Sequence, residues 1–266
     1  MGSGNLPILE NHCFRKFPLS SPLSHLLQTK LGIKLEIGVS NFNRGIMSVS
    51  VNHHIIYPDS DGQPMADNTR QFRWITLVKE NLEILFANDP QVFVAGDLLW
   101  YPVEGHPEIR VAPDAMVVFG RPKGDRGSYR QWEEDNIPPQ VVFEILSPGN
   151  RVQEMTRKFH FYEYYGVEEY YSYDPDKNEL SGFRRQINGN LNPIETMNNW
   201  VSPRLKIKFV LTSETLEIYR PDGKKFLSSV ELYQRAEQES QRAEQESQRA
   251  ERMAAQLRAL GVEPEP

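Results

Sequence analysis

The sequence lacks several features that would assign it to a common protein class. It contains one cysteine, Cys13, which excludes an internal disulfide and a zinc site built on several thiolates. No apolar run approaches the roughly 18 residues that a membrane-spanning helix needs. The first residues lack the basic segment and apolar stretch of a secretory signal. From these absences we expect a cytoplasmic protein with no membrane partner.

Positive charge is also scarce, and so are the signatures of several enzyme chemistries. The formal net charge is −6, which argues against a protein whose main task is to grip nucleic acid. It does not exclude a nuclease, because carboxylates that hold a metal ion count as negative until the ion binds. The sequence has no glycine-rich phosphate loop, no nucleophile elbow, and no histidine spacing typical of a metal site. Nucleotide binding, serine hydrolysis and zinc catalysis therefore find little support.

The composition indicates a folded α/β domain with appendages. The 266 residues are 39% hydrophobic, which suffices for one well-buried domain or at most two small ones. Residues 1–46 are rich in Pro, Ser and Leu without periodicity, and we expect them to form a poorly ordered N-terminal extension. The main domain is expected over residues 47–228, and a helix with heptad repeats over 229–266.

Apolar periodicity predicts the main elements of this domain. Helical spacing predicts helices over 69–87 and 154–165, the second ended by Gly166. The nearly continuous apolar run at 140–146 is typical of a central strand that is covered on both faces. Further strands are expected at 92–95, 98–101, 110–119, 168–173 and 205–209, together with a hairpin of 215–219 and 224–227.

The C-terminal segment repeats seven residues from Arg235 and again from Arg242. One heptad core position holds Ala236, Ala243, Ala250 and Leu257, and the other holds Glu239, Glu246, Met253 and Leu260. The seam is weak because half of the second set is charged. A solvated single helix and a dimerising coiled coil are equal alternatives, and the second would give a homodimer.

Glu144 lies in the middle of the apolar run, where a carboxylate is costly unless a charged group meets it. A functional acid and a buried structural salt bridge are equally consistent with this position. Asp114 follows Pro113 at the start of another apolar strand. If the two strands are neighbours, their carboxylates repel unless a cation lies between them, and the backbone carbonyl of Ile145 could be a third ligand.

Lys158 is the cationic residue that the sequence places near these acids. It lies on the helix predicted at 154–165, beside the apolar stripe of Met155, Phe159 and Tyr162. A lysine in this position either extends its ammonium into solvent or directs it at a metal-bound water. Spacing alone does not choose between these alternatives.

The combination of Pro113-Asp114, the run 143–148 (Phe-Glu-Ile-Leu-Ser-Pro) and Lys158 with Tyr162 and Gly166 resembles the Uma-two family of restriction endonucleases, a branch of the PD-(D/E)xK nucleases. The resemblance covers residues 50–230. It implies a restriction-endonuclease-like fold, with a mixed central sheet flanked by helices. It also implies hydrolysis of DNA phosphodiester bonds with Mg²⁺, for which Mn²⁺ is an alternative.

By motif position, the resemblance implies that Asp114 and Glu144 are metal ligands and that Lys158 orients the attacking water. The parent motif has its lysine two residues after the acid, where this chain has Leu146. In this family the lysine is moved to the following helix, which matches Lys158. If Lys158 pointed outward, the site would lack this group.

Other residues are weaker candidates for the site. Asp97 is either an additional carboxylate or a strand-end turn residue, and Glu169 either supports the site or lies on a strand surface. Gln71, on the first predicted helix, is a further residue whose position would let it face the site. The loop 120–139 carries cations that either contact DNA or belong to a solvated loop with Glu133, Glu134 and Asp135. These cations are Arg121, Lys123, Arg126 and Arg130. A catalytically silent binding or assembly module that uses its coiled-coil tail is the alternative function.

Overall fold

The computed structural model describes residues 33–38, 50–149 and 152–260. The chain divides into two units, Met1–Ile56 and Tyr57–Pro266. In the first unit, β1 (Ile33–Gly38) and β2 (Ser50–Ile55) form an antiparallel pair. Residues 1–32 and 39–46 of the expected N-terminal extension lie outside the described residues.

The second unit is built on a six-stranded sheet with the order β10-β9-β8-β7-β5-β3. β7 and β8 are parallel, and every other neighbouring pair is antiparallel, which confirms the expected mixed sheet. The parallel pair needs a crossover connection, and helix α2 provides it. The strands are β3 (Val92–Ala95), β5 (Ala115–Phe119), β7 (Val141–Ile145), β8 (Glu169–Asp174), β9 (Glu179–Arg185) and β10 (Leu191–Pro193).

Two small sheets accompany the central one. β4 (Trp100–Tyr101) pairs in parallel with β6 (Tyr129–Arg130), which leads into the 3₁₀ turn η1 (Gln131–Glu133). β11 (Lys208–Leu211) pairs with β12 (Leu216–Tyr219) in an antiparallel hairpin.

The hairpin expected between 215–219 and 224–227 is wrong in its second strand. The turn exists, with Gly223 at a positive φ of 79°, but the segment after it contributes only one bridge, between Tyr219 and Lys225. The main partner of β12 is β11, which pairs with it over four residues, and the segment after the turn meets only the other edge of β12.

Helix α1 (Thr69–Leu85) confirms the prediction from apolar spacing. Asn68 caps its N-terminus, since its side chain accepts a 2.9 Å hydrogen bond from the backbone N of Gln71. Ile75, Val78 and Leu82 are buried on one face and pack on the sheet. α1 therefore covers one face of the central sheet.

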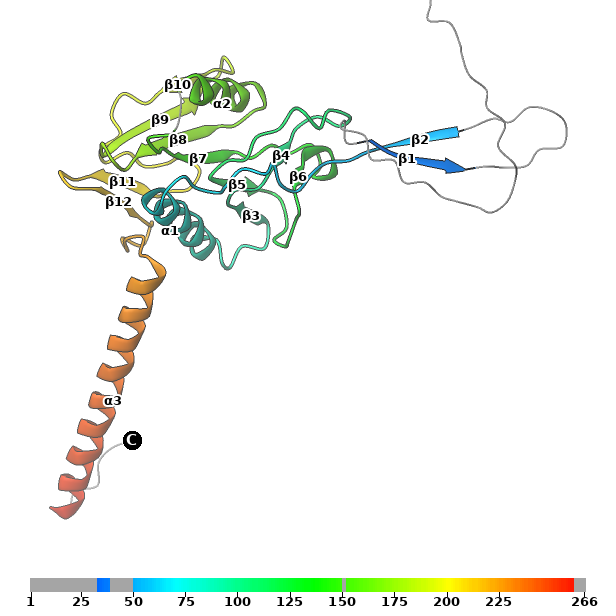
Figure 1. Ribbon diagram of the computed structural model, residues 1–266. Helices are drawn as coiled ribbons and strands as arrows, with labels where there is room; N and C mark the ends of the chain where they lie inside the picture. The colour runs from blue at the N-terminus through cyan, green and yellow to red at the C-terminus, as the bar shows by residue number, and fades with distance from the viewer. Residues whose placement is uncertain (1–32, 39–49, 150–151, 261–266) are drawn as a thin grey trace, which may run out of the picture. The chain divides into compact units, whose positions relative to one another are not determined.

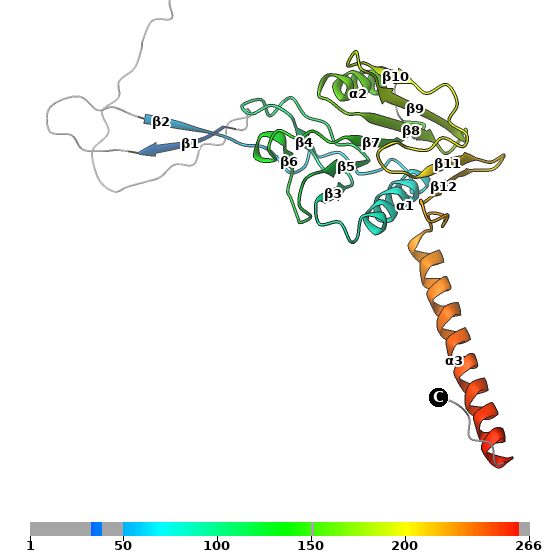
Figure 2. The ribbon, with the colours of Figure 1, turned by 180° about the vertical axis from the view of Figure 1, so that it is seen from behind.

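Helix α2 (Val152–Tyr164) covers the other face, and Figures 1 and 2 show the two helices on opposite sides of the sheet. It ends as the sequence predicts. Gly166 adopts a positive φ of 96°, and the backbone N of Val167 donates to the carbonyl of Tyr162 at 3.0 Å. This ending lets the chain turn directly into β8.

The alternation of side chains along β5 and β7 decides which face each residue serves. Val117, Val141 and Phe143 belong to the core beneath α1, whereas Met116 and Val142 belong to the core beneath α2. By the same alternation, Glu144 faces α2, and so does Asp114, which directly precedes β5. The two acids that the sequence singles out therefore share one side of the sheet.

Helix α3 (Ser229–Ala259) contains no buried residue. Ser228 and Glu231 form a capping box at its start, in which each side chain accepts from the other's backbone N. Just before this cap, Leu227 is fixed to α1 by two hydrogen bonds with the side-chain amide of Asn81, at 2.8 and 3.1 Å. No helix among the described residues is both long and apolar enough to cross a membrane.

Candidate active site

The central feature of the site is an ion pair between β7 and α2. The ammonium of Lys158 lies 2.8 Å from Oε2 of Glu144 and also donates to the carbonyl of Ala112 at 3.4 Å. Glu144 is only 3% exposed, and the side chain of Lys158 is 16% exposed. The lysine thus points inward, and of the two orientations open at the sequence level the structure has the one directed at the acid.

Tyr162 supplies a second donor to the same carboxylate. Its hydroxyl donates to Oε1 of Glu144, and the residue is fully buried. Lys158 and Tyr162 are four residues apart on α2, so they lie one above the other on the same helical face. One turn of α2 therefore holds both oxygens of Glu144.

Asp114 and Ile145 connect β5 and β7 beside this pair. The backbone N of Ile145 donates to Oδ2 of Asp114 at 2.6 Å, and the carbonyl of Ile145 accepts from the side-chain amide of Gln71 at 2.7 Å. Gln71 is held in turn by Asp67, whose backbone N donates to Oε1 of Gln71 at 2.8 Å. The first turn of α1 thus fixes the Ile145 carbonyl from the opposite side.

The electrostatics of the site reflect burial and the closeness of two acids. Burial, and next the neighbouring Glu144 carboxylate, raise the pKa of Asp114 well above its usual range. Burial alone lowers the pKa of Lys158, but the carboxylates of Glu144 and Asp114 outweigh it, so its pKa is raised. The lysine consequently stays protonated at neutral pH.

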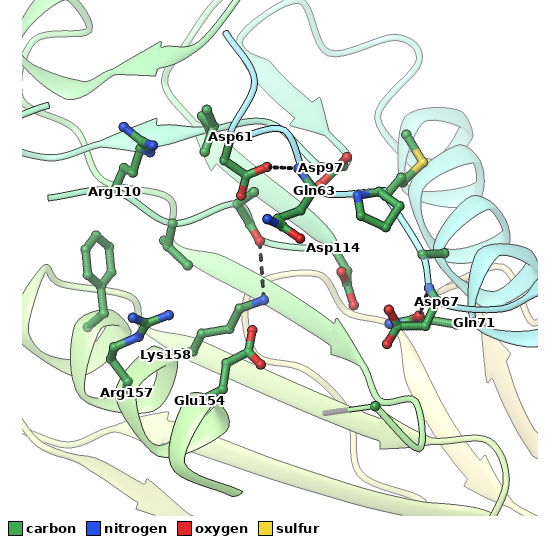
Figure 3. Close-up of a pocket in the computed structure, with 18 of the residues that line it drawn as sticks. Asp61, Gln63, Asp67, Gln71, Asp97, Arg110, Asp114, Glu154, Arg157 and Lys158 are labelled. Carbon is green, nitrogen blue, oxygen red and sulfur yellow. Dashed lines mark hydrogen bonds between the residues drawn. The ribbon is translucent and has the colours of Figure 1, made fainter. Parts of the chain in front are cut away.

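A cavity of about 750 Å³ opens at this site. Asp114 and Lys158 lie on its wall, together with Asp97 and Gln71, and Figure 3 shows their side chains converging from α1, α2 and the segments around β5. Glu144 does not line this cavity and lies behind Lys158. A ligand in the cavity therefore meets Asp114 and Lys158 first.

Asp97 lies where the weaker sequence hypothesis put it, at the end of β3 and on the cavity wall. Its φ is +49°, a left-handed conformation that Asp tolerates better than most residues, and its backbone N donates to the carbonyl of Pro113 at 3.1 Å. Burial, followed by the nearby Asp61 carboxylate, raises the pKa of Asp97. Asp97 is thus both a turn residue and a carboxylate of the cavity.

Glu169, in contrast, is not brought to this site. It is 1% exposed and pairs in register with Val141, so it faces the α1 side of the sheet. Its carboxylate accepts hydrogen bonds from the hydroxyls of Tyr171 and Ser202 and from the backbone N of Arg204. The expectation of a supporting or surface acid fails because the alternation of β8 directs Glu169 into a separate buried cluster.

The cations of the loop 120–139 are engaged within the loop. Arg121 and Arg126 both bind Glu134, at 3.0 and 2.6 Å, and the guanidinium of Arg126 also lies 3.9 Å from the ring centroid of Phe93. Arg130 pairs with Glu133 at 3.4 Å. Lys123 donates to the carbonyl of Val92 at 3.2 Å, and none of the four residues lines the cavity. Their role in DNA contact remains a prediction.

The structure adds residues that sequence reasoning missed. Tyr162 was assigned to the apolar stripe, although its spacing of four residues from Lys158 signals a shared target. Arg110 and Arg157 line the cavity, and Asp61 and Asp67 do so from the segment before α1. No motif marks these four residues, because they meet only through the tertiary fold.

The donor set suits a magnesium ion. Asp114, Glu144 and the Ile145 carbonyl offer hard oxygen ligands of the kind that Mg²⁺ prefers. In this structure Lys158 and Tyr162 donate to the two oxygens of Glu144, and Gln71 donates to the carbonyl. Among the described residues, no three His, Cys, Asp or Glu side chains form a metal-binding group. A site here would therefore depend on two carboxylates, one carbonyl and water.

Comparisons with known proteins identify the family of the chain. Residues 61–213, more than half of the chain, match the family model Uma2, described as "Putative restriction endonuclease". The chain belongs to this family. The match includes α1, the central sheet and α2 but stops before α3.

A structural search returns a crystal structure from Anabaena variabilis, described as a "putative nuclease belonging to DUF820". The sequences are 14% identical, the TM-score is 0.38, and the alignment covers 54% of this chain and 78% of the other. A search of curated proteins finds no match.

Proposed function

We propose that this protein is a magnesium-dependent nuclease that hydrolyses phosphodiester bonds of DNA. The observation that carries the proposal is the 2.8 Å contact between Lys158 and Glu144 beside Asp114, at the wall of a large cavity, in a chain of a restriction-endonuclease family. A buried acid pair with an inward lysine at a cavity wall is the kind of charged cluster that occurs at functional sites.

Asp114, Glu144 and the carbonyl of Ile145 would hold the ion. When bound, Mg²⁺ polarises the scissile phosphate and lowers the pKa of a coordinated water. The chain's own contribution is to position these ligands. β5 and β7 set the distance between the acids, and Gln71 fixes the direction of the Ile145 carbonyl through its 2.7 Å hydrogen bond.

Lys158 supports the reaction as a cation rather than as a base. Its raised pKa keeps the ammonium protonated, so it cannot take a proton from water at neutral pH. A protonated amine at the cavity wall orients the attacking water and stabilises negative charge that develops on the phosphate. Tyr162 holds Glu144 in place beside it.

A plasmid assay tests the proposal. Supercoiled DNA is incubated with the wild type and with Glu144→Gln or Lys158→Met, in Mg²⁺ or in EDTA. We expect the wild type to nick the plasmid in Mg²⁺ but not in EDTA. In each variant the nicking rate in Mg²⁺ should fall at least about 100-fold, the size seen when one transition-state contact is removed. Lys177→Met is the matched control, because Lys177 is an exposed lysine that pairs with Asp174 away from the cavity.

The outcomes separate the alternatives. Equal nicking by all four proteins would indicate a contaminating nuclease and contradict the assigned residues. No nicking by the wild type would favour the silent binding or assembly module.

Assembly through α3 is the second candidate function. α3 has 31 residues, none of them buried, and lies beyond the family match, although an isolated helix gains little stability without packing. Light scattering of the full chain tests this role. A dimer that is lost in Leu257→Glu/Leu260→Glu, and kept in the off-seam control Gln256→Glu/Ala259→Glu, would support the coiled coil. A monomer at all concentrations would exclude it.

A further inference from the structure

The cavity is lined by six acidic and three basic side chains among the residues that the structure describes. A DNA strand carries one negative charge per nucleotide, so most of this wall repels it. Lys158 is already engaged with Glu144. The other two cations are Arg110 and Arg157, and they are the groups on the wall that attract a phosphate backbone.

Arg110 and Arg157 are available for such a contact. Neither forms an ion pair with an acid within residues 55–149 and 152–260. Arg110 donates through Nη1 to the carbonyl of Pro107 at 2.8 Å and also hydrogen-bonds the hydroxyl of Tyr101, and its remaining N–H groups can meet a ligand. Arg157 is exposed and belongs to α2, directly before Lys158.

Their placement brackets the reactive group. Figure 3 shows Arg157 and Lys158 next to each other on α2, with Arg110 on a separate segment of the same cavity. A strand whose scissile phosphate reaches Lys158 therefore has a guanidinium on each of two walls. A guanidinium binds phosphate oxygens with two parallel hydrogen bonds, which fixes orientation as well as affinity.

The arginines of the loop 120–139, unlike Arg110 and Arg157, already form ion pairs. Arg121, Arg126 and Arg130 are each paired with Glu133, Glu134 or Asp135, so a phosphate would have to displace an existing ion pair. Arg126 is further held over the ring of Phe93. The loop is richer in arginine, but its positive charge is already neutralised.

We propose that Arg110 and Arg157 bind the phosphate backbone of the nucleic-acid strand in the cavity, and that the arginines of the loop 120–139 do not. The inference rests on the proposed nuclease function, since it assigns the substrate contacts of the same site. It makes the two arginines substrate-binding residues that position the strand against Lys158.

Binding without metal tests the inference separately from cleavage. Fluorescence anisotropy in EDTA measures the Kd of labelled single-stranded and duplex oligonucleotides at several salt concentrations. We expect Arg110→Gln and Arg157→Gln each to weaken binding about five- to tenfold and to lower the salt slope by about one contact. In the double variant the salt slope should fall by about two phosphate contacts.

Two controls match the charge change. Arg73 is exposed, has no ion pair among the described residues and does not line the cavity, so Arg73→Gln removes the same charge elsewhere. Arg130→Gln tests the loop. Both should change the Kd less than twofold.

The inference would be overturned if Arg110→Gln and Arg157→Gln weakened oligonucleotide binding no more than Arg73→Gln does. It would also be overturned if Arg130→Gln weakened binding more than Arg110→Gln and Arg157→Gln do. An absence of wild-type binding to either oligonucleotide would also overturn it. None of these results decides the proposed function, which the plasmid assay tests in the presence of Mg²⁺.

Discussion

Glu144 and Glu169 are buried glutamates on adjacent strands, and they leave the sheet on opposite faces. Glu144 meets a protonated lysine and a tyrosine hydroxyl, has a second acid nearby, and lies behind a cavity wall. Glu169 meets two hydroxyls and the backbone N of Arg204, forms no ion pair among the described residues and does not line the cavity. The two residues are almost equally buried, at 3% and 1% exposure.

Burial of an acid therefore does not identify a functional site. The Glu169 cluster is satisfied by neutral donors from the segment after β10, and it ties that segment to β8. The Glu144 cluster places two carboxylates together and leaves one of them with a raised pKa. The first arrangement stabilises the fold, whereas the second is an electrostatic cost that a bound cation would relieve.

The largest effect that separates the two clusters is expected for Glu169→Gln. Its amide NH₂ would face either the backbone N of Arg204, which can only donate, or two hydroxyls that would have to turn and accept, so the charge-assisted hydrogen bonds of the carboxylate are lost. We expect the free energy of unfolding to fall by about 3 kcal/mol, with the cleavage rate of the folded protein unchanged. Urea denaturation together with the plasmid assay measures both quantities, and reduced cleavage at unchanged stability would remove the distinction.

Magnesium should act on the Glu144 cluster only. With the ion at 100 times its Kd, the free energy of unfolding should rise by about 2.7 kcal/mol in the wild type and equally in Glu169→Gln. Asp114→Asn should lose most of this gain because it removes one ligand. Thermal denaturation in MgCl₂ and in EDTA measures the gain. A full gain in Asp114→Asn would mean that the ion binds elsewhere.

Two tyrosines provide a matched comparison of smaller size. Tyr162 donates to Glu144, and Tyr171 donates to Glu169 at 2.9 Å, so each Tyr→Phe variant removes one hydroxyl from one buried glutamate. We expect Tyr162→Phe to reduce the cleavage rate about tenfold, equivalent to about 1.4 kcal/mol, because Glu144 loses its positioning. Tyr171→Phe should affect stability alone. Equal cleavage by the two variants would contradict a special role for Tyr162.

The smallest expected effect is the pH dependence of stability that Asp114 causes. Its pKa in the folded state is raised above 3.8, so the folded state binds the proton more tightly than the unfolded chain. Stability is therefore lost as the pH rises through the folded pKa, and the loss is complete above it. In EDTA, Asp114→Asn should be more stable than the wild type by about 1 kcal/mol at pH 8. This stability advantage of Asp114→Asn should vanish at low pH. Urea denaturation across the pH range measures it, and an advantage that grows as the pH falls would contradict the prediction.

Much of the fold follows from local pattern, and the exceptions have physical causes. Apolar spacing gives α1 and α2, and the continuous apolar run gives the central strand β7. β9 carries no comparable signal, because its sequence contains Gly182 and a pair of arginines and its pairing with β8 alone makes it a strand. The pairing of β12 was misjudged because a turn signal says where a chain reverses, not how far the strands extend.

The site is less predictable, since it depends on which side chains share a face. The family motif singled out Asp114, Glu144 and Lys158, and the structure brings these residues together, while their catalytic roles stay predictions. Glu169 was a weaker candidate, and because β8 is buried on both faces, alternation of the sequence gives no indication of its direction. Arg110 and Arg157 reach the cavity only through packing of segments that are distant in sequence.

The two hydrogen bonds between Asn81 and Leu227 connect α1 to the start of the C-terminal helix. Gln71 and Asn81 are ten residues apart on one continuous helix, which places them about 15 Å from each other along its axis. The side-chain amide of Gln71 donates to the carbonyl of Ile145, next to Glu144. The side-chain amide of Asn81 forms hydrogen bonds with Leu227, which lies just before the C-terminal helix. The start of the C-terminal helix and the backbone of the candidate metal site are therefore both hydrogen-bonded to α1, which is itself packed on the sheet.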